Sequence, residues 1–386
     1  MSALKYWVWL SSIGVAPAKA KELLSHLGSV ENIYYAGRAD YLDIAGIKPA
    51  DVEKLMCKDF EKTNAILASC DELGCRVLAL QDSEYPDRLR NIYDSPLVLY
   101  LRGKLPLVDD EPVVGVVGTR KCTPYGITVA ENVSYGMSKS GIIVSTGLAR
   151  GVDTAAIRGA LRGGSSVIGV IGAGVDVVYP PENKSIYDDV ASAGAIISEY
   201  PPGTQPLPHH FPARNRIISG VSLGVAVIEA PKRSGALITA SRALEQGRDV
   251  FSLPGNVDAA ACAGSNALLR EGAIAFMSEK DIIDEYIDLY PDKITLPDKI
   301  ETKNSFDNTS KVDYIDLGNL LEKLDGDERS IVESIGLKSL HCEEIMCDTG
   351  FPAQKVLACL TMLELGGYVL RDKLGKWEIT SELYGG

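Results

Sequence analysis

Short runs of β-branched residues alternate with helical patterns through the middle of the chain. Helices are expected to begin near Tyr125, Val152, Asn183, Ala213 and Ala236. Single helices between consecutive strands call for right-handed crossovers, which produce a parallel, doubly wound sheet. The pattern therefore predicts an α/β, Rossmann-like domain over residues 105–290. Its strands are expected at 112–117, 142–145, 167–171, 195–198, 225–228 and 250–253.

The loops that follow these strands are where a ligand is expected, because doubly wound sheets bind ligands beyond the carboxyl ends of their strands. All six loops are rich in glycine, small hydroxyl residues or arginine. They occupy residues 118–126, 146–153, 172–183, 199–216, 229–239 and 254–266.

The first hundred residues contain a repeat. GVAPAKAKELL, which starts at Gly14, returns as GIKPADVEKLM, which starts at Gly46. The repeat resembles a tandem helix-hairpin-helix, whose G-x-G hairpin offers backbone N–H groups to a phosphate. Ala16 and Lys48 stand where the second glycine would be. A helical packing or interaction module, SAM-like or helix-hairpin-helix-like, is therefore favoured over a DNA-binding one for residues 1–104.

Two more segments are predicted after the sheet. Residues 291–318 are polar and lack an apolar period, which is typical of a linker. Residues 319–386 show three helical patterns and then a β-hairpin, which predicts a winged helix. Winged helices usually read DNA through the third helix, but the helix expected at 352–365 carries only the cation Lys355. Acidic side chains also outnumber basic ones across this domain, so protein contacts are favoured.

The overall composition constrains the location and the partners of the protein. Its formal net charge is −13, yet residues 111–285 are close to neutral, and local patches rather than net charge govern nucleic-acid binding. The sequence contains neither a membrane-spanning apolar run nor a convincing signal peptide. The 8 cysteines are scattered and never form C-x-x-C. These features predict a cytoplasmic protein with reduced thiols and no bound metal.

Two loops carry the chemistry expected of a phosphate site. Gly118 and Thr119 let the backbone approach an anion after the first strand, and Arg120 adds a fork of donors suited to phosphate. Ser234, Gly235 and Thr239 stand at a strand-to-helix turn, the arrangement in which N–H groups and hydroxyls cradle phosphates. The spacing does not give G-x-G-x-x-G, so no nucleotide cofactor is predicted.

FPARNRIISG, residues 211–220, sets Arg214 and Arg216 beside an apolar run, where an unpaired charge is unfavourable. One interpretation is that DNA phosphates neutralise the arginines while unstacked bases rest on apolar or aromatic surface such as Phe211. The alternative is that either arginine pairs with Glu199 or Glu229 and ties loops together. Both interpretations fit the sequence.

Catalytic chemistry finds little support in the sequence. The sheet domain contains only two of the 4 histidines, His209 and His210, and they lie in a proline-rich loop. Asp153, Asp176 and Glu229 stand at strand ends without an HExxH, GxSxG or GxxxxGK[ST] motif beside them.

Taken together, these segments resemble the DNA-processing protein A family (DprA, also called Smf). The resemblance covers nearly the whole chain, both flanking modules included. It is carried by YPDRLRNIYDSPLVLYLRG, VGTR, TGLARGVDTAA, GAGVDVVYPPEN, ISEYPPGTQP, FPARNRIISG, VIEAPKRSGALITASRALEQGRDVFSLPGN and GSNALLREGA.

The resemblance implies a non-enzymatic homodimer that binds single-stranded DNA during natural transformation and loads the RecA recombinase onto it. The family usually has a histidine where Ile157 stands, so any role of that histidine is in doubt here. Loop chemistry and resemblance together give these candidate DNA-binding residues: Gly118, Thr119, Arg120, Gly147, Phe211, Arg214, Asn215, Arg216, Ser234, Gly235, Thr239 and Asn256.

The competing hypothesis is a nucleotide-processing enzyme. Nucleoside-monophosphate phosphoribohydrolases use the same Rossmann variant with the motif PGGxGTxxE. The matching stretch here is APKRSGALITA, which lacks the two leading glycines and the catalytic glutamate, and the next acid is Glu245.

Overall fold

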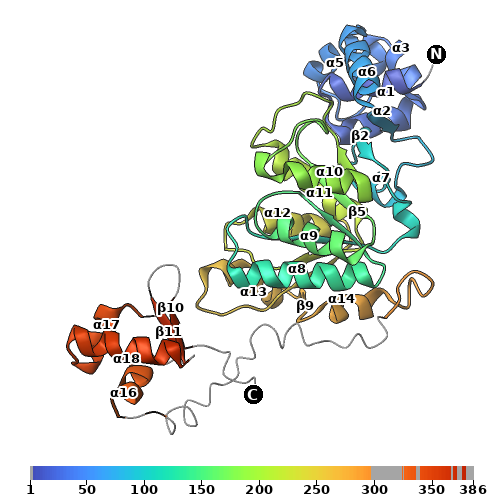
Figure 1. Ribbon diagram of the computed structural model, residues 1–386. Coiled ribbons are helices and arrows are strands. Elements are labelled where there is room, and N and C mark those ends of the chain that lie inside the picture. The colour runs from blue at the N-terminus through green and yellow to red at the C-terminus, as the bar shows by residue number, and fades with distance from the viewer. Residues whose placement is uncertain are drawn as a thin grey trace. The chain divides into compact units, whose positions relative to one another are not determined.

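A computed structural model of the chain describes residues 3–296, 324, 326–335, 340–366, 368–371 and 376–379. It divides into two compact units, Met1–Pro297 and Asp298–Gly386. The first unit contains a helical N-terminal part and a large sheet with helices packed on it (Figure 1). None of the described helices combines the length and the apolar character needed to cross a membrane.

The sheet of the first unit contains the predicted parallel strands. Within the described residues it has nine strands in the order β1-β2-β6-β5-β4-β3-β7-β8-β9. Strands β3 to β6 run outward in one direction, and the chain then crosses to β7 on the other side of β3. The order therefore reverses between β3 and β7, the position at which such sheets bind ligands. The predicted strands are β3 (Val113–Val117), β4 (Ile143–Thr146), β5 (Val167–Ile171), β6 (Ala195–Ser198), β7 (Gly224–Val227) and β8 (Asp249–Ser252).

Three strands of the sheet were not predicted. β1 (Arg76–Ala79) and β2 (Val98–Gly103) form an antiparallel pair, and β2 continues antiparallel onto β6 with Tyr100 opposite Ser198. The short β9 (Ile274–Ala275) extends the other edge beside β8. The sheet therefore begins before residue 105, inside the segment that the sequence assigned to the N-terminal module.

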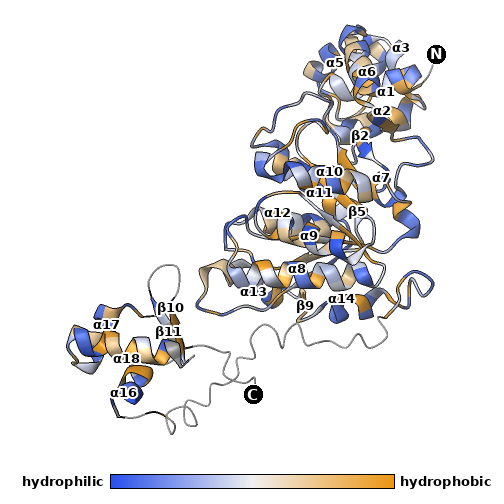
Figure 2. Ribbon diagram, in the orientation of Figure 1, coloured by the Kyte–Doolittle hydropathy of each residue, from blue (hydrophilic) through white to orange (hydrophobic). Residues whose placement is uncertain are grey.

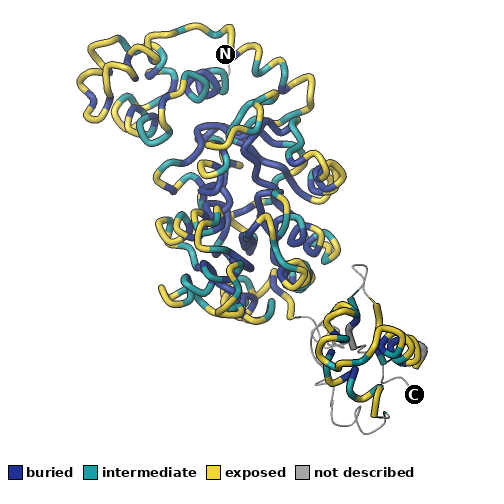
Figure 3. The backbone as a smooth tube through the Cα atoms, turned by 90° about the vertical axis from the view of Figure 1, so that its left-hand side faces the viewer, coloured by how far each residue is buried: buried dark blue, intermediate teal, exposed yellow. Residues whose placement is uncertain are grey.

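Helices cover both faces of the sheet, as right-handed crossovers require. α8 packs against α9 and α9 against α10, while α11 packs against α12 (Figure 1). Buried residues concentrate in the strands between these layers (Figure 3). The helices are α8 (Pro124–Lys139), α9 (Val152–Gly163), α10 (Lys184–Ala193), α11 (His210–Val221), α12 (Gly235–Glu245), α13 (Ala263–Arg270) and α14 (Glu279–Tyr286).

The N-terminal repeat forms two similar helix starts. Gly14 and Gly46 both adopt positive φ, at 74° and 85°, and each leads into a helix that begins at a proline. Lys54 Nζ donates to Gly14 O at 2.6 Å, so the second copy bonds to the first. The helices are α1 (Leu4–Ser12), α2 (Pro17–Leu27), α3 (Val30–Tyr35), α4 (Arg38–Leu42), α5 (Pro49–Met56) and α6 (Glu61–Leu73).

Short elements join these parts of the first unit. Hydrophobic and hydrophilic residues alternate around the turns of its helices (Figure 2), so their apolar faces contribute to one core cluster that runs from α1 through the sheet. The remaining elements are α7 (Asp87–Arg90) and the 3₁₀ turns η1 (Val108–Asp110), η2 (Pro181–Asn183) and η3 (Ala260–Cys262).

The second unit has the predicted elements of a winged helix. In the described part of this unit, three helices and an antiparallel hairpin enclose a separate core that includes Ile331, Leu360 and Trp377. Its elements are α16 (Gly326–Ile335), α17 (Cys342–Thr349), α18 (Ala353–Leu365), β10 (Val369–Arg371) and β11 (Trp377–Ile379).

The predicted linker 291–318 lies outside the described residues from 297 onward. Its first residues pack on the sheet unit: Ile294 is buried, and Thr295 N donates to Ser140 O at 3.0 Å. Lys293 also pairs with Glu111 at 2.6 Å. Residues 291–296 therefore belong to the first unit.

Candidate nucleic-acid interface

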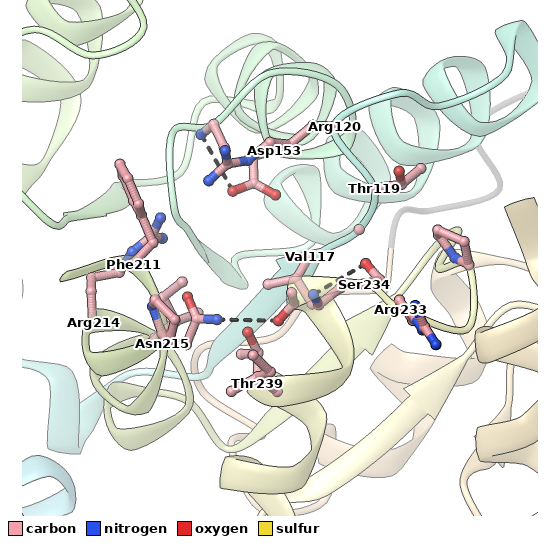
Figure 4. A pocket seen from close by; sticks show the side chains of 18 of the residues that line it. Val117, Thr119, Arg120, Asp153, Phe211, Arg214, Asn215, Arg233, Ser234 and Thr239 are labelled. Atoms are coloured by element: carbon pink, nitrogen blue, oxygen red, sulfur yellow. Dashed lines mark hydrogen bonds between the residues drawn. The ribbon is translucent and has the colours of Figure 1, made fainter. Parts of the chain in front are cut away.

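A cavity of ≈ 520 Å³ opens at the switch point between β3 and β7. Figure 4 shows Phe211, Arg214 and Asn215 reaching it from α11, opposite Arg233 and Ser234 of the loop before α12. We call it the switch-point pocket. Nine of the predicted DNA-binding residues line it: Gly118, Thr119, Arg120, Phe211, Arg214, Asn215, Ser234, Gly235 and Thr239.

Arg120 is one of two exposed cations that line the pocket, and Arg233 is the other. The side chain of Arg120 is exposed, and the centre of its guanidinium lies 5.1 Å from the centre of the Phe211 ring. Phe211 in turn packs against Tyr179, with ring centres 5.5 Å apart. Within the described part of the chain, Arg120 forms no ion pair. Its charge therefore faces solvent beside two aromatic rings, a combination suited to a phosphate and an unstacked base.

Arg214 is buried beneath the rim and packs directly over Gly147. A Cβ added to Gly147 would lie 1.7 Å from Arg214 Nη1, so only glycine allows this approach. Burial lowers the pKa of Arg214, although Asp153 acts in the opposite direction. Gly147 therefore serves the site by admitting the arginine, although it does not line the switch-point pocket itself.

Asp153 is the buried acid that faces Arg214. Its Oδ2 accepts from Gly147 N at 3.1 Å and Ala149 N at 3.4 Å, which holds the loop before α9. Burial raises the pKa of its carboxyl, against the effect of Arg214. The sequence placed Asp153 at a strand end without a catalytic motif and did not predict that it lines the pocket.

The start of α12 supplies the hydroxyls and amides of the pocket wall. Ser234 Oγ accepts from Ala236 N at 3.3 Å and caps the helix. Asn215 Nδ2 donates to Gly235 O at 3.2 Å, which joins α11 to this turn (Figure 4). Ser234 satisfies one N–H of the first turn, and the positive end of the helix dipole still favours an anion there.

Glu229 anchors the other wall. Its carboxylate accepts from Thr123 N at 2.9 Å and from Thr123 Oγ1 at 2.6 Å, and its carbonyl accepts from Thr119 N at 2.7 Å. The acid therefore fixes the loop between β3 and α8, and it pairs with neither Arg214 nor Arg216. At Gly118, an added Cβ would lie 2.5 Å from Val152 Cγ2, so this loop passes tightly over α9.

The structure corrects the prediction for Arg216. Arg216 does not line the pocket and is only 4% exposed. It pairs with Glu199 at 2.7 Å and with Asp94 at 3.2 Å, and it donates to Ala213 O at 2.8 Å. Burial by itself would lower the pKa of Arg216, but Glu199 and Asp94 raise it. Its donors are occupied by the protein, so the loop-tying alternative describes this arginine.

Asn256 also lies away from the pocket lining. Its side chain is exposed, and Oδ1 accepts from Asp258 N at 3.1 Å within a local turn. His210, at the start of α11, stacks on Tyr200 with ring centres 3.9 Å apart, and burial lowers the pKa of its imidazole. Among the described residues, no group of three or more His, Cys, Asp or Glu side chains is placed to hold a metal.

Comparison with known proteins shows what this architecture is. The family model described as DNA recombination-mediator protein A matches residues 76–287, and the DprA winged helix domain matches residues 319–373. The chain belongs to the DNA recombination-mediator protein A family. The predicted family and the predicted winged helix are therefore confirmed. Strands β1 and β2 fall inside the matched region, so the family's domain includes them.

Relatives with names in this family match most of the chain. Protein Smf of Synechocystis is 32% identical over 391 residues, which cover 95% of this chain and 96% of that protein. The crystal structure of DNA processing protein A from Streptococcus pneumoniae aligns with a TM-score of 0.65 and 36% identity, over 74% of this chain and 98% of that chain. The Helicobacter pylori protein, described for its single-stranded DNA binding mode, aligns with a TM-score of 0.51 and 28% identity, over 56% of this chain and 97% of that chain.

Ile157, the departure from the family pattern, is fully buried on α9. It belongs to the same core cluster as its neighbours Ala156 and Ala160. An apolar side chain at this position therefore contributes to packing in this chain and adds no titratable group near the pocket.

Proposed function

We propose that this protein binds single-stranded DNA in the switch-point pocket. The observation that carries the proposal is the rim, where Arg120 is exposed without an ion pair among the described residues and lies 5.1 Å from Phe211. A phosphate can neutralise this guanidinium while a base stacks on the aromatic surface beside it. The binding of single-stranded DNA by the Helicobacter pylori relative supports the same reading.

The pocket favours single strands over duplex for a geometric reason. Its aromatic and apolar lining, Phe211 with Tyr179 and Ile238, can accept only bases that have left a stack. A paired duplex presents its phosphates outward and keeps its base faces covered, so it can use Arg120 but not the rings. We therefore expect the affinity for oligo-dT to exceed the affinity for duplex of equal length.

We also propose that the protein works as a homodimer in the cytoplasm, loads the RecA recombinase onto the bound strand during natural transformation, and performs no catalysis. Each pocket offers few cations, and two linked pockets on one strand gain by effective concentration. Membership of the recombination-mediator family supports a partnership with a recombinase. A strictly monomeric protein at micromolar concentration would contradict the dimer.

Fluorescence anisotropy with labelled oligo-dT tests the binding proposal. Arg120→Ala should weaken binding to all single-stranded sequences alike, because phosphate contacts carry no base information. Arg270→Ala is the matched control, since Arg270 is exposed and lines neither the switch-point pocket nor the small cavity beside it. Equal affinities of the two variants would place the DNA elsewhere.

The competing enzymatic hypothesis has its own test. Glu245, the nearest acid after the phosphoribohydrolase-like stretch, lies at the end of α12 and pairs with Arg242 at 2.7 Å. It is absent from the lining of the switch-point pocket. Incubation with AMP should therefore release no ribose phosphate, and release at ordinary enzymatic turnover would replace the binding proposal.

A further inference from the structure

A second large cavity, ≈ 620 Å³ in volume, lies at the opposite end of α12 from the switch-point pocket. Its walls come from α7 and the turn after it, from the C-terminal end of α12 and from Tyr290. Cavities of this size hold small-molecule ligands in other proteins. We call it the α12 C-terminal pocket.

Three buried polar atoms of its lining residues have no hydrogen-bond partner within the described chain: Arg88 Nη1, Arg248 Nε and Gln246 Oε1. Across the described residues, the arginine nitrogens in this condition belong to Arg88, Arg248 and Arg214, and Arg214 lines the switch-point pocket. Buried donors without partners are rare because each costs free energy. The arginines that carry these partnerless nitrogens line the two large cavities. Both cavities are therefore suited to bind an anion.

The two arginines are held in place by their other donors. Arg88, whose side chain is 10% exposed, donates through Nη2 to Asp109 O, Glu111 O and the Tyr290 hydroxyl, at 3.0, 2.9 and 2.6 Å. Arg248 Nη2 donates to Arg88 O at 3.0 Å. Burial lowers the pKa of Arg248, and the positive charge of Arg88 adds to that effect. Two cations kept together in this way would be stabilised by an anion between them.

The acids of the same cavity already have partners within the chain. Asp109 Oδ1 lies 4.0 Å from Arg88 Nε, and Asp87 pairs with Arg90. Asp94 pairs with Arg216 at 3.2 Å, and Glu245 pairs with Arg242 at 2.7 Å. Asp109 accepts from the backbone N of Asp87 and of Arg88, at 2.6 and 2.9 Å. The C-terminal end of α12 contributes only about half a negative charge. The polar atoms of the lining that the described chain leaves without a partner are therefore Arg88 Nη1, Arg248 Nε and Gln246 Oε1.

We propose that the α12 C-terminal pocket binds a phosphate-bearing ligand, for which a nucleoside monophosphate has the best fit. Guanidinium forks of Arg88 and Arg248 match phosphate oxygens, and Gln246 Oε1 accepts from a hydroxyl or amine of the ligand. Tyr93 lines the cavity and is 84% exposed, so its ring offers a stacking face for a base. The proposal does not depend on DNA binding in the switch-point pocket.

Isothermal titration calorimetry of the full chain with AMP and with inorganic phosphate tests the site. Arg248→Lys keeps the charge but removes the Nε donor and the fork, and AMP affinity should fall about 10-fold or more. Arg270→Lys is the matched control and should bind as the wild type does. Tyr93→Ala, at an exposed position where folding is not at stake, should weaken AMP binding while leaving inorganic phosphate unchanged.

Two arms identify the source of the phosphate. If the ligand is a free nucleotide, Arg248→Lys weakens AMP but leaves oligo-dT binding unchanged; an equal loss of both assigns the cavity to the DNA backbone. The proposal is overturned if neither AMP nor phosphate binds at millimolar concentration. It is also overturned if Arg120→Ala abolishes AMP binding while Arg248→Lys and Tyr93→Ala leave it intact, since the ligand would then lie in the switch-point pocket.

Discussion

Two regions of the sheet unit place an arginine in opposite environments, one exposed and one buried in ion pairs. At the rim of the switch-point pocket, Arg120 is exposed and stacks on Phe211. On the other side of α11, Arg216 is buried and bonded to Glu199, Asp94 and the backbone. The comparison teaches that an arginine in an acidic protein is a candidate for DNA only after its intramolecular partners are accounted for.

The largest effect is expected at the buried arginine. Arg216→Ala leaves Glu199 and Asp94 without their partner, and a broken buried pair costs about 3 kcal/mol of unfolding free energy. In a unit of this size that lowers the melting temperature by roughly 5 °C. Thermal melts followed by circular dichroism measure it. The salt dependence of DNA binding should not change, and a shallower slope in a fully stable variant would restore Arg216 to the DNA site.

A methyl group at Gly147 should displace Arg214, the buried arginine that packs over this glycine. Gly147→Ala forces Arg214 away from its place, because the added Cβ would lie 1.7 Å from Nη1, and such overpacking costs about 1–3 kcal/mol. The affinity for oligo-dT should fall with the misplaced guanidinium. In an Arg214→Ala background the same substitution should cost little, so a double-mutant cycle on unfolding free energy measures the coupling. Additive costs would contradict the packing argument.

At the exposed rim, the effect should appear in binding and not in folding. Arg120→Ala should flatten the slope of log affinity against log salt by about 0.7, the value for one phosphate contact on a single strand. Its unfolding free energy should stay within about 0.5 kcal/mol of wild type. Anisotropy titrations at several salt concentrations give the slope. A destabilised variant with an unchanged slope would make Arg120 a structural residue like Arg216.

The smallest effect is expected from the winged helix, where acidic side chains outnumber basic ones and α18 carries the single cation Lys355. A chain ending after Leu296 should keep its affinity for oligo-dT. A chain ending at Tyr290 loses buried Ile294 and the Lys293–Glu111 pair, so it should also lose stability. Comparing both truncations separates a loss of DNA contacts from a loss of packing. Abolished binding in the longer, folded truncation would move the DNA site.

The sequence predicted the parallel strands well because each is a short β-branched run between clear helices. β5 and β6 have the predicted bounds, and the other four differ by one or two residues. β1 and β2 were missed because the helix between them, α7, has only four residues, so the alternation of strands with long helices that identified the others is missing there. Pairing of β2 with β6, distant in sequence, is what makes VLYLRG a strand.

The sequence predicted which loops form the candidate site, but it did not predict where their side chains point. Arg214 and Arg216 lie two positions apart, and on a helix of 3.6 residues per turn such side chains point about 200° apart. The helix was expected to begin near Ala213, whereas α11 begins at His210 and contains both arginines. Because of this two-position spacing, one arginine faces the pocket and the other faces Asp94 and Glu199. The pairing of Arg216 also depends on the turn before β2, because that turn carries Asp94. The sequence pattern did not predict where this turn lies.

The strand pairing between β2 and β6 links the helical N-terminal module to the sheet, and one apolar core runs through both. Neither part can lose its structure without exposing the other's core. We therefore expect residues 3–296 to unfold in a single cooperative transition, with the winged helix melting separately around its own core. Amide hydrogen exchange would then show similar protection in α1, β2 and β6. The N-terminal module therefore cannot move independently of the sheet. A partner that binds the module is also fixed relative to the sheet.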